Sequence, residues 1–213
     1  MKRPIRSALT RLFSEPPFRI LARAALRMMK PSVSTRALWE ISERPVYLLG
    51  VLAAAQQAIR QDVKEISVME FGVAGGNGLL ALEKEAAAVE GETGVRIQVY
   101  GFDAGAAGLP KLIGDYRDHP DAWKQGDYPM DEEQLRARLS ERTKLIIGPV
   151  HDTTIAFWKT FDAPPVGFIS IDVRVTHCRF CPTQNVGCYG MYRCTSTTST
   201  SSLTADSAAN CLR

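Results

Sequence analysis

The sequence predicts an α/β fold, an open parallel sheet with helices on both faces. Short β-branched runs alternate with stretches of helical periodicity, and the runs are apolar almost throughout, as in strands that are covered on both sides. The length of 213 residues favours one domain, or one domain with appendages. The predicted strands cover 66–71, 95–103, 143–148 and 166–173, and the predicted helices cover 45–60, 78–90, 130–142 and 153–161.

Local signals support these elements in chain order. Pro45 suits the first turn of the helix over 45–60, and Gly91 or Gly94 suits the end of the helix over 78–90. The helix over 130–142 carries acidic residues in its first turn, where they complement the helix dipole. Each of these helices stands beside a strand, which favours repeated βα units.

The N-terminal segment is basic and amphipathic. Residues 1–30 carry eight Lys or Arg and a single acid, Glu15. Apolar residues recur at helical spacing at Phe18, Leu21, Ala22, Ala25 and Met29. We expect a helical extension over 1–60. This extension would pack on the domain or on a second subunit of a homo-oligomer. Alternatively, it would lie on an anionic membrane surface or serve as a transit peptide.

The C-terminal segment differs sharply from the rest. All five cysteines and a polar, low-complexity stretch lie beyond Arg174, where Asp206 is the one acid. We expect a partial domain over 61–173 and an irregular tail over 174–213 that is read in a shifted frame or replaces the original half. The spacing of Cys178, Cys181, Cys188 and Cys194 matches no strong zinc pattern.

Composition also limits the partners. A net charge of +3 is too small to imply a nucleic acid, and no apolar run approaches the roughly 18 residues of a membrane span. The body without cysteine favours a cytoplasmic protein.

The stretch "VMEFGVAGGNGLLALEKEA", residues 68–86, carries the chemistry. A strand runs through a glycine-rich turn into a helix, whose N-terminus presents N–H groups to a nucleotide-type ligand at the carboxyl edge of the sheet. No Gly-Lys-Ser/Thr follows, so a P-loop is excluded.

A dinucleotide fingerprint fits the same stretch poorly. It can be forced onto Gly76, Gly78 and Ala81, but it then starts several residues beyond the strand. Glu70 would repel a pyrophosphate and would suit a ligand with positive charge. Asp103 ends the second strand, where an acceptor of a ribose diol belongs. A nicotinamide-dependent oxidoreductase stays open as an alternative.

The motif "EFGVAGGNG" resembles motif I of class I S-adenosylmethionine-dependent methyltransferases, which have a Rossmann-like sheet. Gly72, Gly76 and Gly78 stand on its glycine positions, and Ala74 stands on one that is often glycine. The segment "VYGFDAGAAGLP", 99–110, is similar to the macrocin O-methyltransferase (TylF-like) branch, and the resemblance covers about 40–173.

This resemblance implies site roles for several residues. Glu70 would order the glycine loop near the methionine moiety of S-adenosyl-L-methionine, and Asp103 would bind the ribose hydroxyls. In that branch an "IDxD" segment binds a divalent metal. Asp172 would thus be a catalytic residue and a ligand of Mg²⁺, but Arg174 occupies the second position, so a metal site there would be weak. His151 is either a general base or a solvated loop residue.

The resemblance also implies a strand order of 3-2-1-4 in a sheet whose C-terminal half is incomplete, with the fourth strand at an edge. We therefore expect methyl transfer to a hydroxyl of a sugar or other small-molecule substrate. The alternative outside the enzymes is a truncated, catalytically inactive methyltransferase-like product. His119, Trp123 and Tyr128 either line an acceptor site or pack within their long loop.

Overall fold

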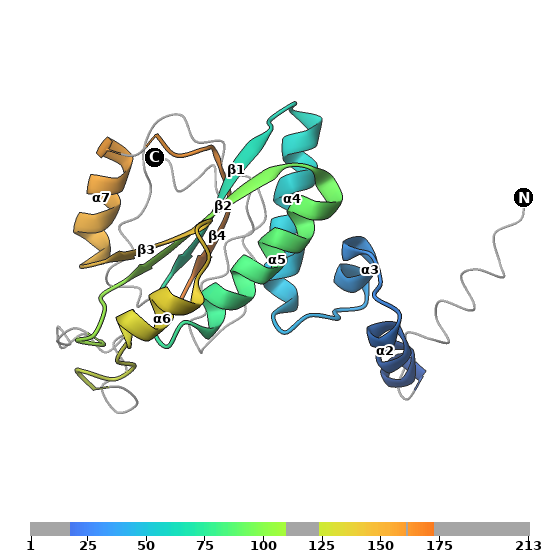
Figure 1. Ribbon diagram of the computed structural model, residues 1–213, viewed down its shortest axis with the longest axis horizontal. Helices are drawn as coiled ribbons and strands as arrows, with labels where there is room; N and C mark the ends of the chain where they lie inside the picture. Colours follow the sequence, from blue (N-terminus) through green and yellow to red (C-terminus); the bar gives the residue numbers. More distant parts are fainter. Residues whose placement is uncertain (1–17, 110–123, 161, 173–213) are drawn as a thin grey trace, which may run out of the picture.

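The computed structural model describes residues 18–109, 124–160 and 162–172. Its centre is a parallel sheet of four strands in the order β3-β2-β1-β4 (Figure 1). The strands are β1 (Glu65–Phe71), β2 (Arg96–Asp103), β3 (Thr143–Ile147) and β4 (Val166–Ile171). This arrangement confirms the predicted open, Rossmann-like parallel sheet and its strand order.

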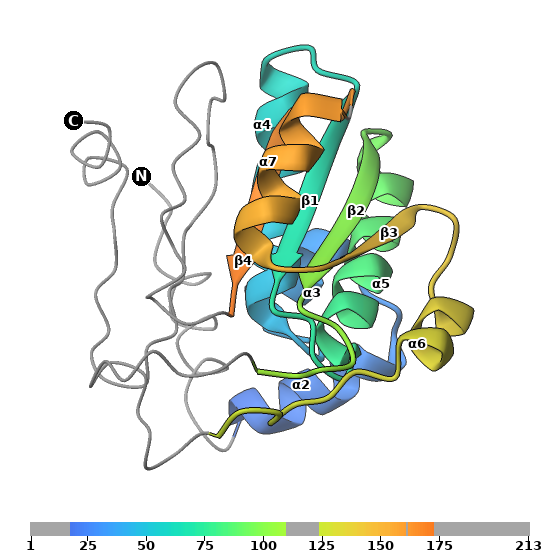
Figure 2. The ribbon, with the colours of Figure 1, turned by 90° about the vertical axis from the view of Figure 1, so that its left-hand side faces the viewer.

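Helices cover both faces of the sheet, as predicted. The described helices are α2 (Phe18–Met28), α3 (Val33–Leu38), α4 (Pro45–Arg60), α5 (Asn77–Thr93), α6 (Glu132–Arg138) and α7 (Val150–Thr160). Helices α4 and α5 pack on one face, and α7 packs on the other (Figure 2). Helix α3, which the sequence analysis did not predict, packs against α4, and α2 lies beyond it, away from the sheet.

The alternation of side chains along the strands divides the core in two. Ile66 and Val68 of β1 join the cluster under α4 and α5, whereas Met69 and Phe71 join the cluster under α7. By the same alternation Glu70 belongs to the α4 and α5 face. In the sheet register Glu70 stands between Gly101 of β2 and Ser170 of β4.

The helix ends follow local chemistry. Pro45 occupies the first turn of α4, as predicted. Helix α5 runs through Gly91 and ends at Thr93; its C-cap is Gly94, whose φ of 74° is the left-handed conformation that glycine adopts readily. Asp131 caps α6 by accepting a hydrogen bond from the N–H of Gln134. This helix ends at Arg138, earlier than the predicted 142, because Leu139 is extended.

The start of helix α7 decides the position of the candidate residue His151. Helix α7 begins at Val150, three residues before the predicted start, because the carbonyl of Pro149 accepts the N–H groups of Asp152 and Thr153. His151 therefore lies in the first turn of a helix, and its expected position in a loop was wrong.

Several predictions fall outside the described residues. They concern the tail over 174–213 with its cysteines and Arg174, as well as His119 and Trp123. Within the described part of the chain, no helix combines the length and the apolar character that crossing a membrane requires.

Candidate functional site

Three carboxylates gather at the carboxyl edge of the sheet. Glu70 lies near the end of β1, Asp103 ends β2, and Asp172 follows β4, where its N–H donates to the carbonyl of Phe71. Parallel strands bring their carboxyl ends to one edge, so a motif on β1 acquires neighbours from β2 and β4. Charges on Asp172 and Asp103 both act on Glu70, and both raise its pKa.

The glycine loop between β1 and α5 has the backbone that its composition predicts. Gly72 and Gly76 have φ of 88° and 84°, values that glycine adopts without strain. Ala74 has φ of 48°, which an L-residue adopts at a cost of about 1 kcal/mol. Gly76 is the N-cap of α5 and provides no side-chain cap to the first N–H groups of the helix.

Asp103 ties this loop to β2. Its Oδ2 accepts the backbone N–H groups of Val73 and Ala74, each at 2.8 Å, and its Oδ1 accepts the N–H of Gly105 at 2.8 Å. A carboxylate offers about four acceptor positions, so Oδ1 keeps capacity for a further donor. Asp103 is half-buried and fixes the shape of the loop, a role that the sequence analysis did not predict.

Glu70 is buried directly beneath the start of α5. Its side chain is held by the hydroxyl of Tyr47, which donates to Oε1 at 2.6 Å. Oε2 is buried and has no hydrogen-bond partner among the described residues. A Cβ at position 78 would overlap Oε1 of Glu70, so the third glycine of the motif gives the carboxyl group its space.

Burial sets the charge of this group. Glu70 is 2% exposed, and its desolvation raises the pKa to about 7, against the lowering effects of the hydrogen bond from Tyr47 and the charge of Arg44. The pKa of Tyr47 is also raised, chiefly by the burial of its hydroxyl and further by the negative charge of Glu70. At neutral pH the carboxyl is therefore only partly ionised, and a nearby cation would favour its charged form.

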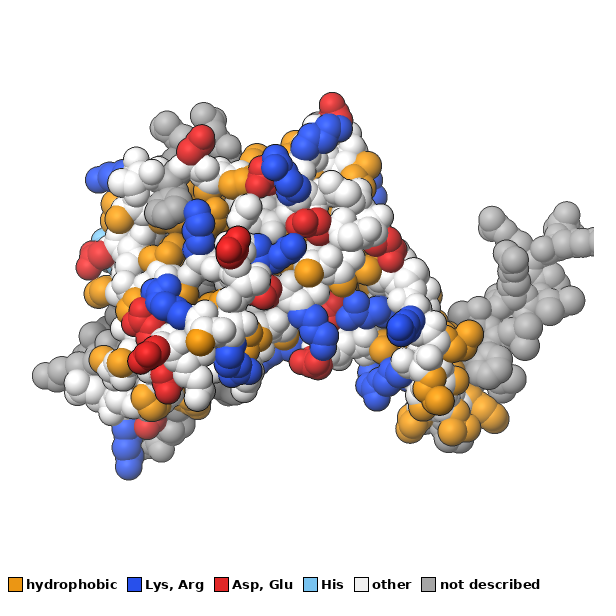
Figure 3. Space-filling view, viewed as in Figure 1, with side chains coloured by type: hydrophobic (Ala, Val, Ile, Leu, Met, Phe, Trp, Pro, Cys, Tyr) orange, Lys and Arg blue, Asp and Glu red, His pale blue; other side chains and the backbone are white. Residues whose placement is uncertain are grey.

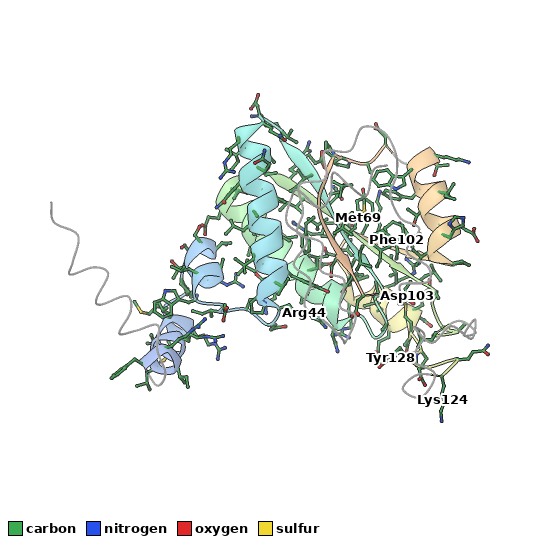
Figure 4. The ribbon with its side chains drawn as sticks, turned by 180° about the vertical axis from the view of Figure 1, so that it is seen from behind. Arg44, Met69, Phe102, Asp103, Lys124 and Tyr128 are labelled. Atoms are coloured by element: carbon green, nitrogen blue, oxygen red, sulfur yellow. The ribbon has the colours of Figure 1, made fainter. Side chains whose placement is uncertain are left out.

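Helix α4 supplies the partners of Glu70 from outside the motif. Tyr47 also accepts a hydrogen bond from the hydroxyl of Ser170 on β4, at 3.2 Å, and the guanidinium of Arg44 lies 5.4 Å from the centre of its ring. Figure 4 shows Arg44 at the beginning of α4 and Asp103 at the end of β2. The carboxyl edge thus combines groups from α4, β1, β2 and β4.

No sequence motif predicts a role for Tyr47 or Ser170, although the alternation of β4 contains part of the information. Ser170 has the same strand parity as Phe168, which faces α4, so the alternation of β4 could have placed it on that face. Tyr47 lies on an apolar helix, where a tyrosine ordinarily contributes its ring to the core. The sequence does not predict that its hydroxyl donates to Glu70, because this contact depends on how α4 crosses the sheet.

The two predicted catalytic residues stand apart. His151 follows β3 and is exposed, whereas Asp172 follows β4 at the opposite end of the sheet order. Three strand spacings separate those strands, or about 14 Å. The structure therefore brings Asp172, and not His151, next to β1.

Among the described residues, no three His, Cys, Asp or Glu side chains are grouped in a way that could hold a metal ion, so Glu70, Asp103 and Asp172 do not form such a group. Asp172 as a ligand of Mg²⁺ stays a prediction.

Tyr128 lies in the described part of the loop between β2 and α6. Its side chain, labelled in Figure 4, is exposed. The helix that follows contacts the glycine loop, because a Cβ at position 76 would overlap the side chain of Leu135 of α6.

Comparisons with known proteins found distant structural likenesses. No protein-family model and no curated protein matches the sequence. The chain is similar to a solved structure described as CalS11, calicheamicin methyltransferase, with 20% identity, a TM-score of 0.41 and coverage of 74% of this chain and 68% of that one. A second structure is described as apo CalS11, TDP-rhamnose 3'-O-methyltransferase, with 18% identity, a TM-score of 0.33 and coverage of 75% and 67%.

A third structure is described as cofactor-bound Rv0187 from MTB. It has 17% identity, a TM-score of 0.27, and coverage of 80% of this chain and 62% of that one. Because these likenesses are distant, the function proposed below rests on the residues of this chain.

Proposed function

We propose that this chain binds S-adenosyl-L-methionine at the carboxyl edge of its sheet, for methyl transfer to a hydroxyl of a sugar or small metabolite. The observation that carries the proposal is the buried carboxyl of Glu70 under the glycine loop, at the same edge of the sheet as Asp103 and Asp172, whose charges act on it. Three carboxylates at one edge favour a cationic ligand over a pyrophosphate. This charge also weighs against a nicotinamide dinucleotide at the same place.

The residues present fit the cofactor. The methionine moiety carries an ammonium group and a sulfonium, and Glu70 has a buried oxygen, Oε2, without a partner among the described residues. Asp103 keeps acceptor capacity on Oδ1 for a ribose hydroxyl. The N-terminus of α5 lacks a side-chain cap, so its N–H groups are available to polar atoms of a ligand.

When bound, S-adenosyl-L-methionine would supply an electrophilic methyl group on its sulfonium. The chain would contribute chiefly by positioning the acceptor hydroxyl in line with that group. Asp172 is the better candidate to accept the hydroxyl proton, because it is exposed and follows the strand next to β1. His151 lies too far along the sheet to act at the same point.

Calorimetric titration with S-adenosyl-L-homocysteine tests the binding step. Because the bound ammonium group favours ionised Glu70, binding between about pH 6 and pH 7 should release a proton, which appears as a dependence of the heat on the buffer's ionisation enthalpy. Glu70→Gln should abolish that dependence and weaken affinity by about tenfold or more. Glu133→Gln, at an exposed residue of α6, is the matched control and should behave like the parent.

Asp103→Ala should also weaken binding, since it removes both the loop anchor and the ribose acceptor. NAD serves as the competing ligand. Heat with NAD, and none with S-adenosyl-L-homocysteine or S-adenosyl-L-methionine, would replace the proposal with the nicotinamide alternative. No heat with any of the three would favour an inactive methyltransferase-like product.

A further inference from the structure

Helix α2 presents an apolar surface that no described residue covers. None of its residues is buried. Its exposed residues are all apolar except Arg27: Phe18, Ile20, Leu21, Ala24, Ala25 and Met28. Leu21 is 64% exposed and Met28 is 87% exposed. Figure 3 shows this apolar group at the end of the molecule that α2 forms, with basic side chains next to it.

The opposite side of the helix attaches it to the rest of the chain. Arg19 forms an ion pair with Glu40 at 2.8 Å, and Arg23 donates a hydrogen bond to the carbonyl of Glu40 at 2.6 Å. Helical spacing puts Arg19 and Arg23 on one side of the axis and Leu21, Ala25 and Met28 on the other. The two arginines thus hold α2 with its apolar side outward, so packing of this side on the domain does not occur among the described residues.

A basic residue lies beside the apolar side. Arg27 is exposed at one margin of this side, and α2 contains no acidic residue. Residues 1–30 carry eight Lys or Arg and one acid. Long basic side chains beside an apolar helix face can extend toward anionic headgroups while their stems stay in the apolar layer. This distribution is typical of helices that lie in a membrane interface.

A second copy of the chain fits this surface less well. Eleven residues make a helix about 16 Å long and about 10 Å wide, which presents far less than the roughly 800 Å² that each partner buries in a stable dimer. Pairing two copies through α2 would also bring the exposed Arg27 of each copy near the other. A bilayer requires no matching surface, and its negative potential attracts the arginines instead.

We infer that α2 docks the protein onto membranes that contain anionic phospholipid, with its apolar side in the interface. This inference does not depend on the proposed methyl transfer.

Vesicle sedimentation with the full chain tests the inference. The probes are vesicles of phosphatidylcholine alone and vesicles with about a third phosphatidylglycerol, at low and high salt. We expect binding to the anionic vesicles that high salt weakens. Leu21→Glu and Met28→Glu should each reduce it by about tenfold or more, since each puts a charge into the apolar interface.

Ile59→Glu is the matched control, because Ile59 is an exposed apolar residue of α4, away from α2. It should bind like the parent, and unchanged far-ultraviolet circular dichroism should show that all variants fold. Absence of binding to anionic vesicles would overturn the inference, as would an equal loss in Ile59→Glu. Light scattering that shows a dimer dissociated by Leu21→Glu, without vesicle binding, would assign the surface to a second copy.

Discussion

Replacing Glu70 by Gln tests the central electrostatic feature of the site without any ligand. The carboxyl has a pKa of 4.5 in the unfolded chain and about 7 in the folded one, because burial disfavours its charge. The folded state therefore holds this proton more tightly than the unfolded state. Stability from this group is fully present below about pH 4.5 and is lost as the pH rises through 7.

The size of the effect follows from the shift. About 2.5 pKa units at about 1.4 kcal/mol each correspond to about 3 kcal/mol of stability lost between about pH 4.5 and pH 8. The glutamine amide is close in shape and stays neutral, so Glu70→Gln escapes this loss. Glu70→Gln also changes the hydrogen bond with Tyr47, which shifts the unfolding free energy by the same amount at every pH. The loss of proton linkage adds a second change in the unfolding free energy, and this change depends on pH.

Urea unfolding at about pH 5 and about pH 8 measures the difference. Relative to the parent, Glu70→Gln should gain about 2 to 3 kcal/mol of unfolding free energy between the two conditions. Glu133→Gln, at an exposed position, should show no such gain. If the two free-energy differences for Glu70→Gln agree at both pH values, the carboxyl is not buried as described and the reasoning fails.

Three further predictions concern the groups around Glu70. Tyr47→Phe should raise the pKa of Glu70 further and lower the unfolding free energy by about 2 kcal/mol at about pH 8, because the charged carboxylate loses its hydrogen-bond donor. An equal loss of unfolding free energy at pH 5, measured by urea unfolding, would contradict this. Asp103→Asn should lower the unfolding free energy by about 1 to 3 kcal/mol, because its NH₂ must face a backbone N–H; unchanged stability would count against the loop anchor. Ala74→Gly should raise the melting temperature slightly by relieving the left-handed φ, whereas Gly76→Ala should lower it through strain and contact with Leu135; the reverse order would refute the loop geometry.

Much of the fold could be predicted because its signals are local. The apolar runs of β1 to β4 and the helical periodicity of α4 and α5 lie in contiguous residues, so their bounds were predicted to within a few positions. The glycine loop could also be predicted, since the positive φ values at Gly72 and Gly76 favour a residue without Cβ. Helix α3 escaped prediction because it has only six residues and its stability comes from packing.

The contacts of the candidate site were decided by tertiary structure. The sequence by itself determined that a carboxyl group at position 70 precedes a glycine-rich turn. The crossing of α4 over the sheet determined that Tyr47 donates to that carboxyl and that burial raises its pKa to about 7. The apolar spacing of α2 is likewise a property of the sequence, but its outward side depends on Arg19 and Arg23 reaching Glu40. Periodicity arises within one element, whereas desolvation and pairing arise between elements that are distant in the chain.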